Sequence, residues 1–267
     1  MCLLTYFPPG TPPDPFALSV GAAVNPHGHG FAVIAGTRII TGHGMHATTV
    51  IDHFTAVRAR YPRWAALFHS RYATHGERSV ANCHPFRLGD DRRTVLAHNG
   101  TLPKRVHPGP YDRRSDTRIA AEEYLARHPF GSIDTRRGAS GLQSWLGSSK
   151  LVILTVDPTY RHSAYLFGEQ AGRWDGGIWY SNTSYQPQPC RPARRILCRS
   201  CLNVDFDRTS LYCIRCGWCF DCDTVFPDCE CAENHHAGGL PTRARPACPG
   251  FLRVAPAAEV DVRPVCR

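Results

Sequence analysis

The sequence predicts an α+β fold in which helices enclose two antiparallel sheets. The first observation is a set of apolar runs with the length and composition of strands, at residues 2–7, 17–24, 30–40, 65–72, 94–98, 150–156, 164–167 and 177–181. The second is a helical spacing of apolar residues over 48–60 and 116–127, and the runs form two clusters with these helices between them. The third is that strands and helices do not alternate one by one, as they do in a parallel sheet. Periodicity alone leaves the order of the layers open.

Turn and capping residues limit the predicted elements. Five prolines within 8–15 predict a loop after the first strand. The glycine-rich stretch 25–30 predicts a turn, in which His27 and His29 are loop residues rather than ligands. Ser, Thr, Asn and Asp are preferred at helix N-caps. The predicted caps are Thr48 or Thr49 for the first helix and Ser115 for the second.

Length and charge narrow the possible classes of protein but do not identify one. A chain of 267 residues can bury a sizeable core in one large domain or two. Its net charge of +9 permits contact with nucleic acid, although a soluble, arginine-rich protein has the same composition. The stretch after Met1 has no basic segment and only a short apolar run, so it does not resemble a secretion signal. No apolar run is long enough to span a bilayer, and we expect a cytoplasmic protein.

Thirteen cysteines, eight of them within 198–231, predict a metal site. Pairs of cysteines two residues apart suit tetrahedral zinc, and two such pairs complete one site of four thiolates. Iron–sulfur ligation and a cross-braced pairing remain alternatives. We expect a linker at 186–197, a zinc module at 198–236 held by metal rather than by a core, and a poorly ordered, proline-rich tail at 237–267. The predicted ligands are Cys198, Cys201, Cys213, Cys216, Cys219, Cys222, Cys229 and Cys231, with His235 and His236 behind them.

Four separated segments carry residues that would form one reactive site. Cys2 follows Met1, so removal of Met1 would put a thiol and a free α-amine on the same residue, and the amine can act as the base. Arg71 can hold a carboxylate through two parallel hydrogen bonds, and Asp116 can hold an ammonium group. The Asn99 side chain and the backbone N–H of Gly100 can stabilise an oxyanion.

These segments resemble the class II glutamine amidotransferases, which have an N-terminal cysteine nucleophile. The resemblance rests on Cys2 and on the segments R-Y-A-T-H-G at 71–76, H-N-G at 98–100 and S-D-T at 115–117, and it covers residues 2–185. It implies a four-layer αββα fold and hydrolysis of glutamine to glutamate and ammonia through a γ-glutamyl thioester on Cys2, with no cofactor. The roles it implies are catalysis by Cys2, Asn99 and Gly100, and substrate binding by Arg71, Thr74, His75 and Asp116. The sequence departs from the family pattern at Leu3 and Tyr72.

The acceptor of the ammonia leaves no signal in the sequence. The chain has no phosphate-binding loop motif, and its C-terminal third is too small for a synthetase domain. We therefore expect the acceptor site on a partner protein, with the zinc module as a docking unit. Two alternatives remain: a stand-alone amidohydrolase of the same class acting on another amide, and a zinc-dependent regulator that binds nucleic acid or protein through an inactive amidase fold.

Overall fold

The structure is a computed structural model that describes residues 2–187 and, beyond them, residues 196–197, 200–201, 204–205, 216 and 218. The chain divides into two units, Met1–Pro187 and Gln188–Arg267. The described part of the second unit contains the antiparallel strands β11 (Ile196–Leu197) and β12 (Val204–Asp205). The predicted linker and tail and six of the eight predicted zinc ligands lie mainly or wholly outside the described residues. None of the described helices is long and apolar enough to cross a membrane.

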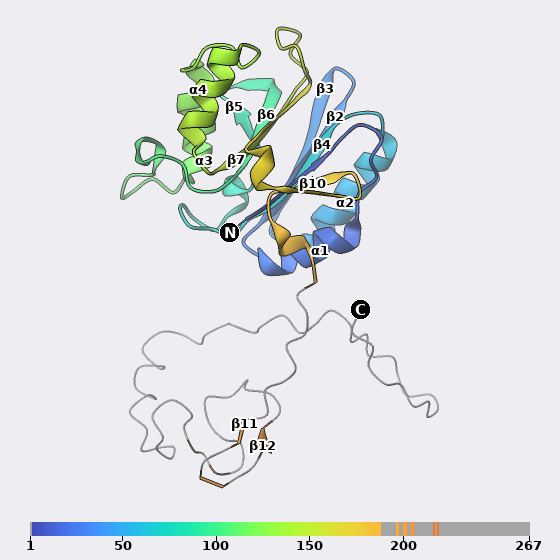
Figure 1. Cartoon of the computed structure of the whole chain (residues 1–267), viewed down its shortest axis with the longest axis vertical. Coiled ribbons are helices and arrows are strands. Elements are labelled where there is room, and N and C mark those ends of the chain that lie inside the picture. Colours follow the sequence, from blue (N-terminus) through green and yellow to red (C-terminus); the bar gives the residue numbers. More distant parts are fainter. Residues whose placement is uncertain are drawn as a thin grey trace. The chain divides into compact units, whose positions relative to one another are not determined.

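The first unit contains two antiparallel sheets (Figure 1). The larger sheet has the strand order β3-β2-β4-β1-β10-β9, and the smaller has the order β5-β6-β7-β8. The strands of the larger sheet are β1 (Leu3–Phe7), β2 (His29–Ala35), β3 (Arg38–Gly44), β4 (Ala66–Ser70), β9 (Arg173–Asp175) and β10 (Ile178–Tyr180). Those of the smaller sheet are β5 (Phe86–Leu88), β6 (Asp91–Asn99), β7 (Lys150–Thr155) and β8 (Ala164–Phe167).

Helices cover the outer face of each sheet (Figure 1). The helices α1 (Pro15–Val24) and α2 (Ala47–Arg60) pack on the larger sheet, and the segment beginning with α3 (Asp116–Ile119) packs with α4 (Arg136–Leu146) on the smaller one. After α3 the chain continues through a π-helical turn and a 3-10 turn. The short helical turns of the unit are η1 (Val80–Asn82), η2 (Lys104–Val106), the π turn η3 (Ala120–Tyr124), η4 (Leu125–Arg127), η5 (Glu169–Ala171) and η6 (Thr183–Tyr185).

Three buried clusters account for this layering. Leu3 points into the core under α1 and α2, whereas the next residue, Leu4, points into the core between the two sheets, as the period of a strand requires. Leu96 of β6 faces α3 and α4, whereas Val95 and Ala97 face the larger sheet. Because both sheets bury both of their faces, the unit is a four-layer αββα sandwich.

Two of the predicted strands are wrong. Residues 17–24 form α1, because the Asp14 carboxylate accepts a hydrogen bond from the Ala17 N–H at 3.0 Å and Pro15 occupies the first helical turn. Residues 30–40 are not one strand: the chain reverses at Gly36, which has φ +71°, and forms the β2–β3 hairpin. His29 lies in β2 rather than in a loop.

Other boundaries also differ from the prediction. The N-cap of α2 is His46, not Thr48 or Thr49, and its side chain makes no capping hydrogen bond. Ser115 does cap α3, accepting a hydrogen bond from the Arg118 N–H at 3.2 Å. The strands predicted at 2–7, 65–72, 94–98, 150–156, 164–167 and 177–181 are present as β1, β4, β6, β7, β8 and β10, whereas β5, β9 and α4 were not predicted.

A buried arginine fixes the proline-rich loop that follows β1. Arg58 is only 1% exposed, and its guanidinium donates hydrogen bonds to the carbonyls of Pro8, Thr11, Tyr61 and Trp64. The carbonyls of Pro8 and Tyr61 also accept the N–H groups of Thr11 and Trp64, so the guanidinium adds to the hydrogen bonds of these turns. This arginine therefore holds the loop against the C-terminus of α2.

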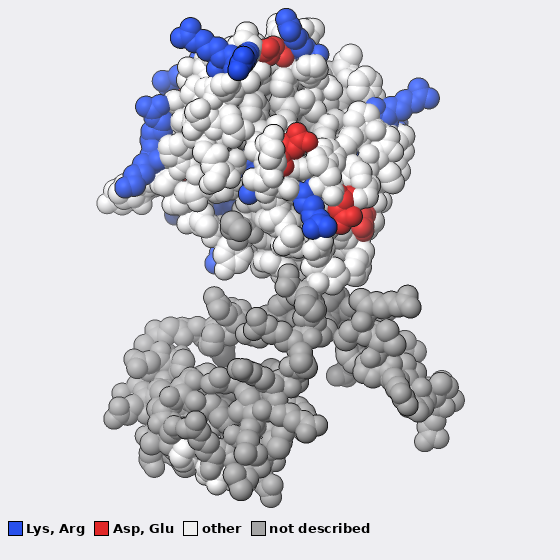
Figure 2. All heavy atoms as spheres, viewed as in Figure 1, with Lys and Arg blue, Asp and Glu red and all other residues white. Residues whose placement is uncertain are grey.

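Charged side chains are spread over the visible face of the first unit. In the view of Figure 2, lysine and arginine side chains stand along the edges with uncharged surface between them, and acidic side chains lie near some of them. The net positive charge is thus not gathered into one continuous patch on that face, and contact with nucleic acid stays a prediction.

Candidate active site

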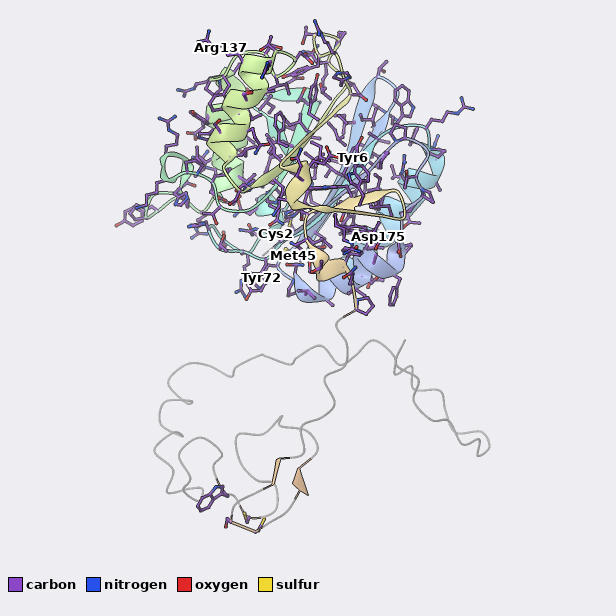
Figure 3. The ribbon with its side chains drawn as sticks, viewed as in Figure 1. Cys2, Tyr6, Met45, Tyr72, Arg137 and Asp175 are labelled. Carbon is purple, nitrogen blue, oxygen red and sulfur yellow. The ribbon has the colours of Figure 1, made fainter. Side chains whose placement is uncertain are left out.

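Strand register brings the predicted nucleophile against the predicted arginine. Leu3, the first residue of β1, pairs with Ser70, the last residue of β4, so Cys2 lies opposite the chain that continues through Arg71 and Tyr72. The Tyr72 N–H donates a hydrogen bond to the Cys2 Sγ at 3.2 Å, and the thiol lies 3.5 Å from the Tyr72 carbonyl. Cys2 and Tyr72 are labelled at this edge of the unit in Figure 3.

The environment of Cys2 raises the pKa of its thiol but also contains groups that favour the thiolate. Burial raises the pKa of the Cys2 thiol, while the Tyr72 N–H and the charge of Arg71 act in the opposite direction. The carbonyl of Cys2 accepts a hydrogen bond from the Asn182 Nδ2 at 2.7 Å, which fixes the main chain of the nucleophile. A thiol with a raised pKa needs a base before it can attack.

The predicted oxyanion hole lies at the end of β6. Asn99 is 3% exposed, and one N–H of its amide donates to the Ser181 Oγ at 2.8 Å. The same hydroxyl oxygen accepts the Leu4 N–H at 2.9 Å, so the ends of β1, β6 and β10 are tied together. The amide has a second N–H that can be given to a ligand.

Gly100 cannot be replaced without moving the chain. Its φ is +146°, and an added Cβ would lie 2.2 Å from the Ser149 Oγ. The backbone beside Asn99 is therefore held in a conformation that favours glycine, and the role of the Gly100 N–H as an oxyanion donor stays a prediction.

Arg71 is a buried cation held by main-chain groups. It is 2% exposed, and its guanidinium donates to the carbonyls of Glu77 at 2.8 Å and His75 at 2.6 Å. Among residues 2–187 no carboxylate forms an ion pair with it. Burial lowers the pKa of Arg71, and the nearby acidic groups of Cys2, Cys83 and Asp116 act in the opposite direction. Since a guanidinium has five N–H donors, several remain for a carboxylate ligand.

Asp116 lies at the start of α3, within electrostatic range of both Cys2 and Arg71. It is 6% exposed; its Oδ2 accepts the Leu102 N–H at 3.3 Å and its Oδ1 accepts the Thr117 N–H at 2.8 Å. The structure thus gathers Cys2, Arg71 and Asp116, which are far apart in the sequence, into one site.

The two remaining predicted substrate residues are placed differently. Thr74 is exposed. The carbonyl of His75 supports Arg71, while its ring packs on the ring of His107 at 4.5 Å between centroids. His75 therefore joins the loop after β4 to the loop after β6. Its direct contact with a substrate stays a prediction.

Several residues of the site carry no motif and were missed in the sequence. Ser181 and Asn182 hold Asn99 and Cys2, and they follow a short strand with no pattern around it. His27 lies in the loop before β2, as predicted; its Nδ1 accepts the Ala73 N–H at 3.0 Å, and the centroid of its ring lies 4.7 Å from that of Tyr72.

Three buried histidines lie behind the site. The rings of His69 and His84 stack at 3.9 Å, and the His69 Nε2 lies 3.1 Å from the His98 carbonyl. The His98 Nδ1 lies 3.0 Å from the Thr117 hydroxyl, next to Asp116. Burial lowers the pKa of His69 to about 3 and that of His98 to about 4, and it holds the pKa of His84 well below its usual range. All three are therefore neutral near pH 7.

The structure does not test the predicted zinc site. Of its eight cysteines only Cys201 and Cys216 belong to the described residues, and both are half-buried. Within the described part of the chain, no three His, Cys, Asp or Glu side chains are grouped as metal ligands. Zinc stays a prediction that rests on cysteine spacing.

Comparison with known proteins gives one family match. Residues 23–135 match the family described as glutamine amidotransferases class-II. This range includes Arg71, Asn99, Gly100 and Asp116, whereas Cys2 lies outside it.

Relatives of known sequence and structure are similar over part of their length. Glutamine–fructose-6-phosphate aminotransferases (isomerizing) from two strains of Streptococcus pneumoniae are 32% identical over 105 residues, or 38% of this chain and 15% of each relative. A glutamine phosphoribosylpyrophosphate amidotransferase from B. subtilis superposes with a TM-score of 0.42 at 18% identity, over 69% of this chain and 42% of that one. A glutamine aminotransferase class-II domain protein from Silicibacter pomeroyi superposes with a TM-score of 0.31 at 14% identity, over 67% of this chain and 87% of that one.

Proposed function

We propose that the chain is a class II glutamine amidotransferase that hydrolyses glutamine through a thioester on Cys2, and the family match at residues 23–135 supports this proposal. The observation that carries the proposal is the buried guanidinium of Arg71. It has no carboxylate partner among residues 2–187, and it lies within electrostatic range of Cys2 and Asp116. A buried cation is costly unless a ligand supplies the opposite charge. The α-carboxylate of an amino acid is such a ligand.

Substrate binding uses both charged ends of glutamine. Arg71 takes the α-carboxylate through the N–H groups not donated to Glu77 and His75. Asp116 takes the α-ammonium group. With both ends held, the side-chain amide extends toward the Cys2 Sγ, and the cost of orienting it is met before the reaction begins.

The reaction forms a thioester on Cys2 and then hydrolyses it. After removal of Met1, the α-amine of Cys2 accepts the thiol proton, and the Tyr72 N–H stabilises the thiolate at 3.2 Å. Sulfur attacks the amide carbon, and the free N–H of Asn99 with the N–H of Gly100 binds the oxyanion. The amine returns the proton to the leaving nitrogen, so ammonia departs. Water then attacks the thioester carbonyl, which releases glutamate and restores the thiol.

The test is turnover by the purified full chain, with its N-terminus determined by intact mass. We expect equal amounts of glutamate and ammonia from protein that begins at Cys2, and no turnover from Cys2→Ala. Full activity with Met1 retained would contradict the mechanism, because the amine would then be absent. Turnover of another acyl amide in preference to glutamine would indicate the related amidohydrolase function. No turnover of any amide would favour the inactive regulator.

Three further proposals concern the metal, the ammonia acceptor and the location of the protein. The cysteine spacing supports zinc in the module at 198–236. The chain aligns with the matched aminotransferases over only 15% of their length, and an ammonia acceptor site on a partner protein stays a proposal. A place in the cytoplasm also stays a proposal; none of the described helices is long and apolar enough to cross a membrane.

A further inference from the structure

One buried amide touches both sides of the substrate pocket. Asn82, the last residue of η1, is 1% exposed. Its Nδ2 donates to the carbonyls of Arg113 at 2.7 Å and Glu77 at 3.0 Å, and its Oδ1 accepts the Ser115 N–H at 2.9 Å. The orientation of the amide follows from these partners, because carbonyls only accept and a backbone N–H only donates.

Two of the three partners of Asn82 are next to a charged group of the site. The Glu77 carbonyl that accepts from Asn82 also accepts from the Arg71 guanidinium at 2.8 Å. Ser115 directly precedes Asp116 and caps α3. The amide is thus the side chain through which the supports of Arg71 and Asp116 are joined.

The two loops that carry these groups are in direct backbone contact. The Glu77 N–H donates to the Arg113 carbonyl at 2.9 Å. Gly76 has φ +73°, and an added Cβ would lie 2.7 Å from the backbone of Arg114 and Ser115. Because the loops meet without intervening side chains, a small change at Asn82 or Gly76 alters their separation.

We propose that Asn82 is a positioning residue that sets the spacing between Arg71 and Asp116, and thereby the selectivity of the site for α-amino acids. This inference rests on the proposed function, because the two clamps matter only if the substrate carries both an α-carboxylate and an α-ammonium group. Such a substrate presents the two charges at one fixed separation, so misplacing either clamp weakens binding at both ends. The reacting amide and Cys2 are held by other residues, so the chemical step is affected less.

The test compares glutamine with two analogues, glutaramate, which lacks the amino group, and 4-aminobutanamide, which lacks the carboxylate. Asn82→Asp keeps the size and the acceptor of Asn82 but turns two donors into an oxygen that faces two carbonyls. We expect KM for glutamine to rise by roughly tenfold with kcat changed by no more than about twofold. The preference for glutamine over glutaramate and the preference for glutamine over 4-aminobutanamide should both decrease.

Two variants separate positioning from general damage. Thr94→Val removes a buried hydrogen bond, 2.8 Å between the hydroxyls of Thr94 and Thr155, at a point about 17 Å along β6 from Asn99. It should lower the melting temperature without changing KM or the analogue preference. Gly76→Ala should push the two loops apart and reproduce the Asn82→Asp kinetics by a different route. Should Asn82→Asp not fold, Asn82→Ser, which keeps one donor, and Gly76→Ala decide the question.

Turnover of glutamine by wild type tests the proposed function, whereas the KM and the analogue preference of the variants test the positioning role. If wild type hydrolyses glutamine, and folded Asn82 and Gly76 variants keep its KM and its preference over both analogues, the positioning role is overturned. Loss of preference against only one analogue would also overturn it, since the two clamps would then be independent. If wild type does not turn over glutamine, the proposed function fails. Glutamine binding to Cys2→Ala and to the Cys2→Ala/Asn82→Asp double variant, measured by calorimetry, then still tests the spacing.

Discussion

At the scale of single residues, the oxyanion site depends on a hydroxyl as well as on an amide. Asn99 can offer an N–H to the substrate only while its side chain is held in one orientation, and the Ser181 Oγ holds it at 2.8 Å. The same oxygen accepts the Leu4 N–H, so the hydroxyl is itself fixed by the strand that begins after Cys2. Asn182 adds a bond to the Cys2 carbonyl. The proposed nucleophile Cys2 and the proposed oxyanion donor Asn99 are thus positioned by two adjacent residues after β10.

Replacing Ser181 should therefore affect the chemical step rather than binding. In Ser181→Ala the Asn99 amide loses its fixed partner, and we expect kcat to fall by roughly tenfold with KM nearly unchanged. Asn99→Ala should lower kcat by roughly 10²–10³ because the donor itself is lost. Steady-state kinetics with glutamine measure both, with the exposed Ser163→Ala as the control. A raised KM with an unchanged kcat would show that Ser181 supports binding instead.

At the scale of elements, the strands and the reactive motifs could be predicted because they are local patterns. Apolar runs located β1, β4, β6, β7 and β8, and the motif around Arg71 lies at the end of one of them. The strand predicted at 17–24 is α1 because a cap and a proline outweigh an apolar run of small residues. Ser181, Asn182 and Asn82 could not be predicted, since each acts on residues 82, 180 or 33 positions away in the chain. Such roles exist only once the sheets are assembled.

The buried histidines make the region where the two sheets meet sensitive to acid. Histidine has a pKa near 6.5 in an unfolded chain. In the folded protein the pKa is about 4 for His98 and about 3 for His69. The unfolded chain therefore binds more protons below pH 6.5. Stability should be complete above that pH and should fall as the pH drops from 6.5 toward 4.

The variant that tests this is His84→Leu. Neither ring nitrogen of His84 has a hydrogen-bond partner within residues 2–187, and its ring packs on His69 and Phe86. Leucine keeps the apolar contacts and cannot be protonated, so the melting temperature should fall less between pH 7 and pH 5 than in wild type. The exposed His46→Gln is the control. Equal pH dependence in wild type and His84→Leu would assign the acid sensitivity elsewhere.

At the scale of the whole molecule, the catalytic residues and the cysteine cluster fall in different parts of the chain. Every residue assigned here to binding or chemistry lies within 2–187, and the three buried clusters that support them lie there too. The eight clustered cysteines lie within the second unit, Gln188–Arg267. No step of the proposed reaction uses a metal, so the two parts can be tested independently.

We expect about two zinc ions per chain, because eight thiolates complete two tetrahedral sites. Their removal by acid or a strong chelator should unfold the module, since metal supplies most of the folding energy of so short a segment. Glutamine turnover should largely survive chelation and deletion of residues 198–267, whereas ammonia transfer to a partner should be lost. Elemental analysis and kcat of the full and shortened chains measure this. A chain purified without metal would overturn the zinc module. A glutaminase rate that falls in step with zinc removal would show that the metal serves the active site rather than a separate module.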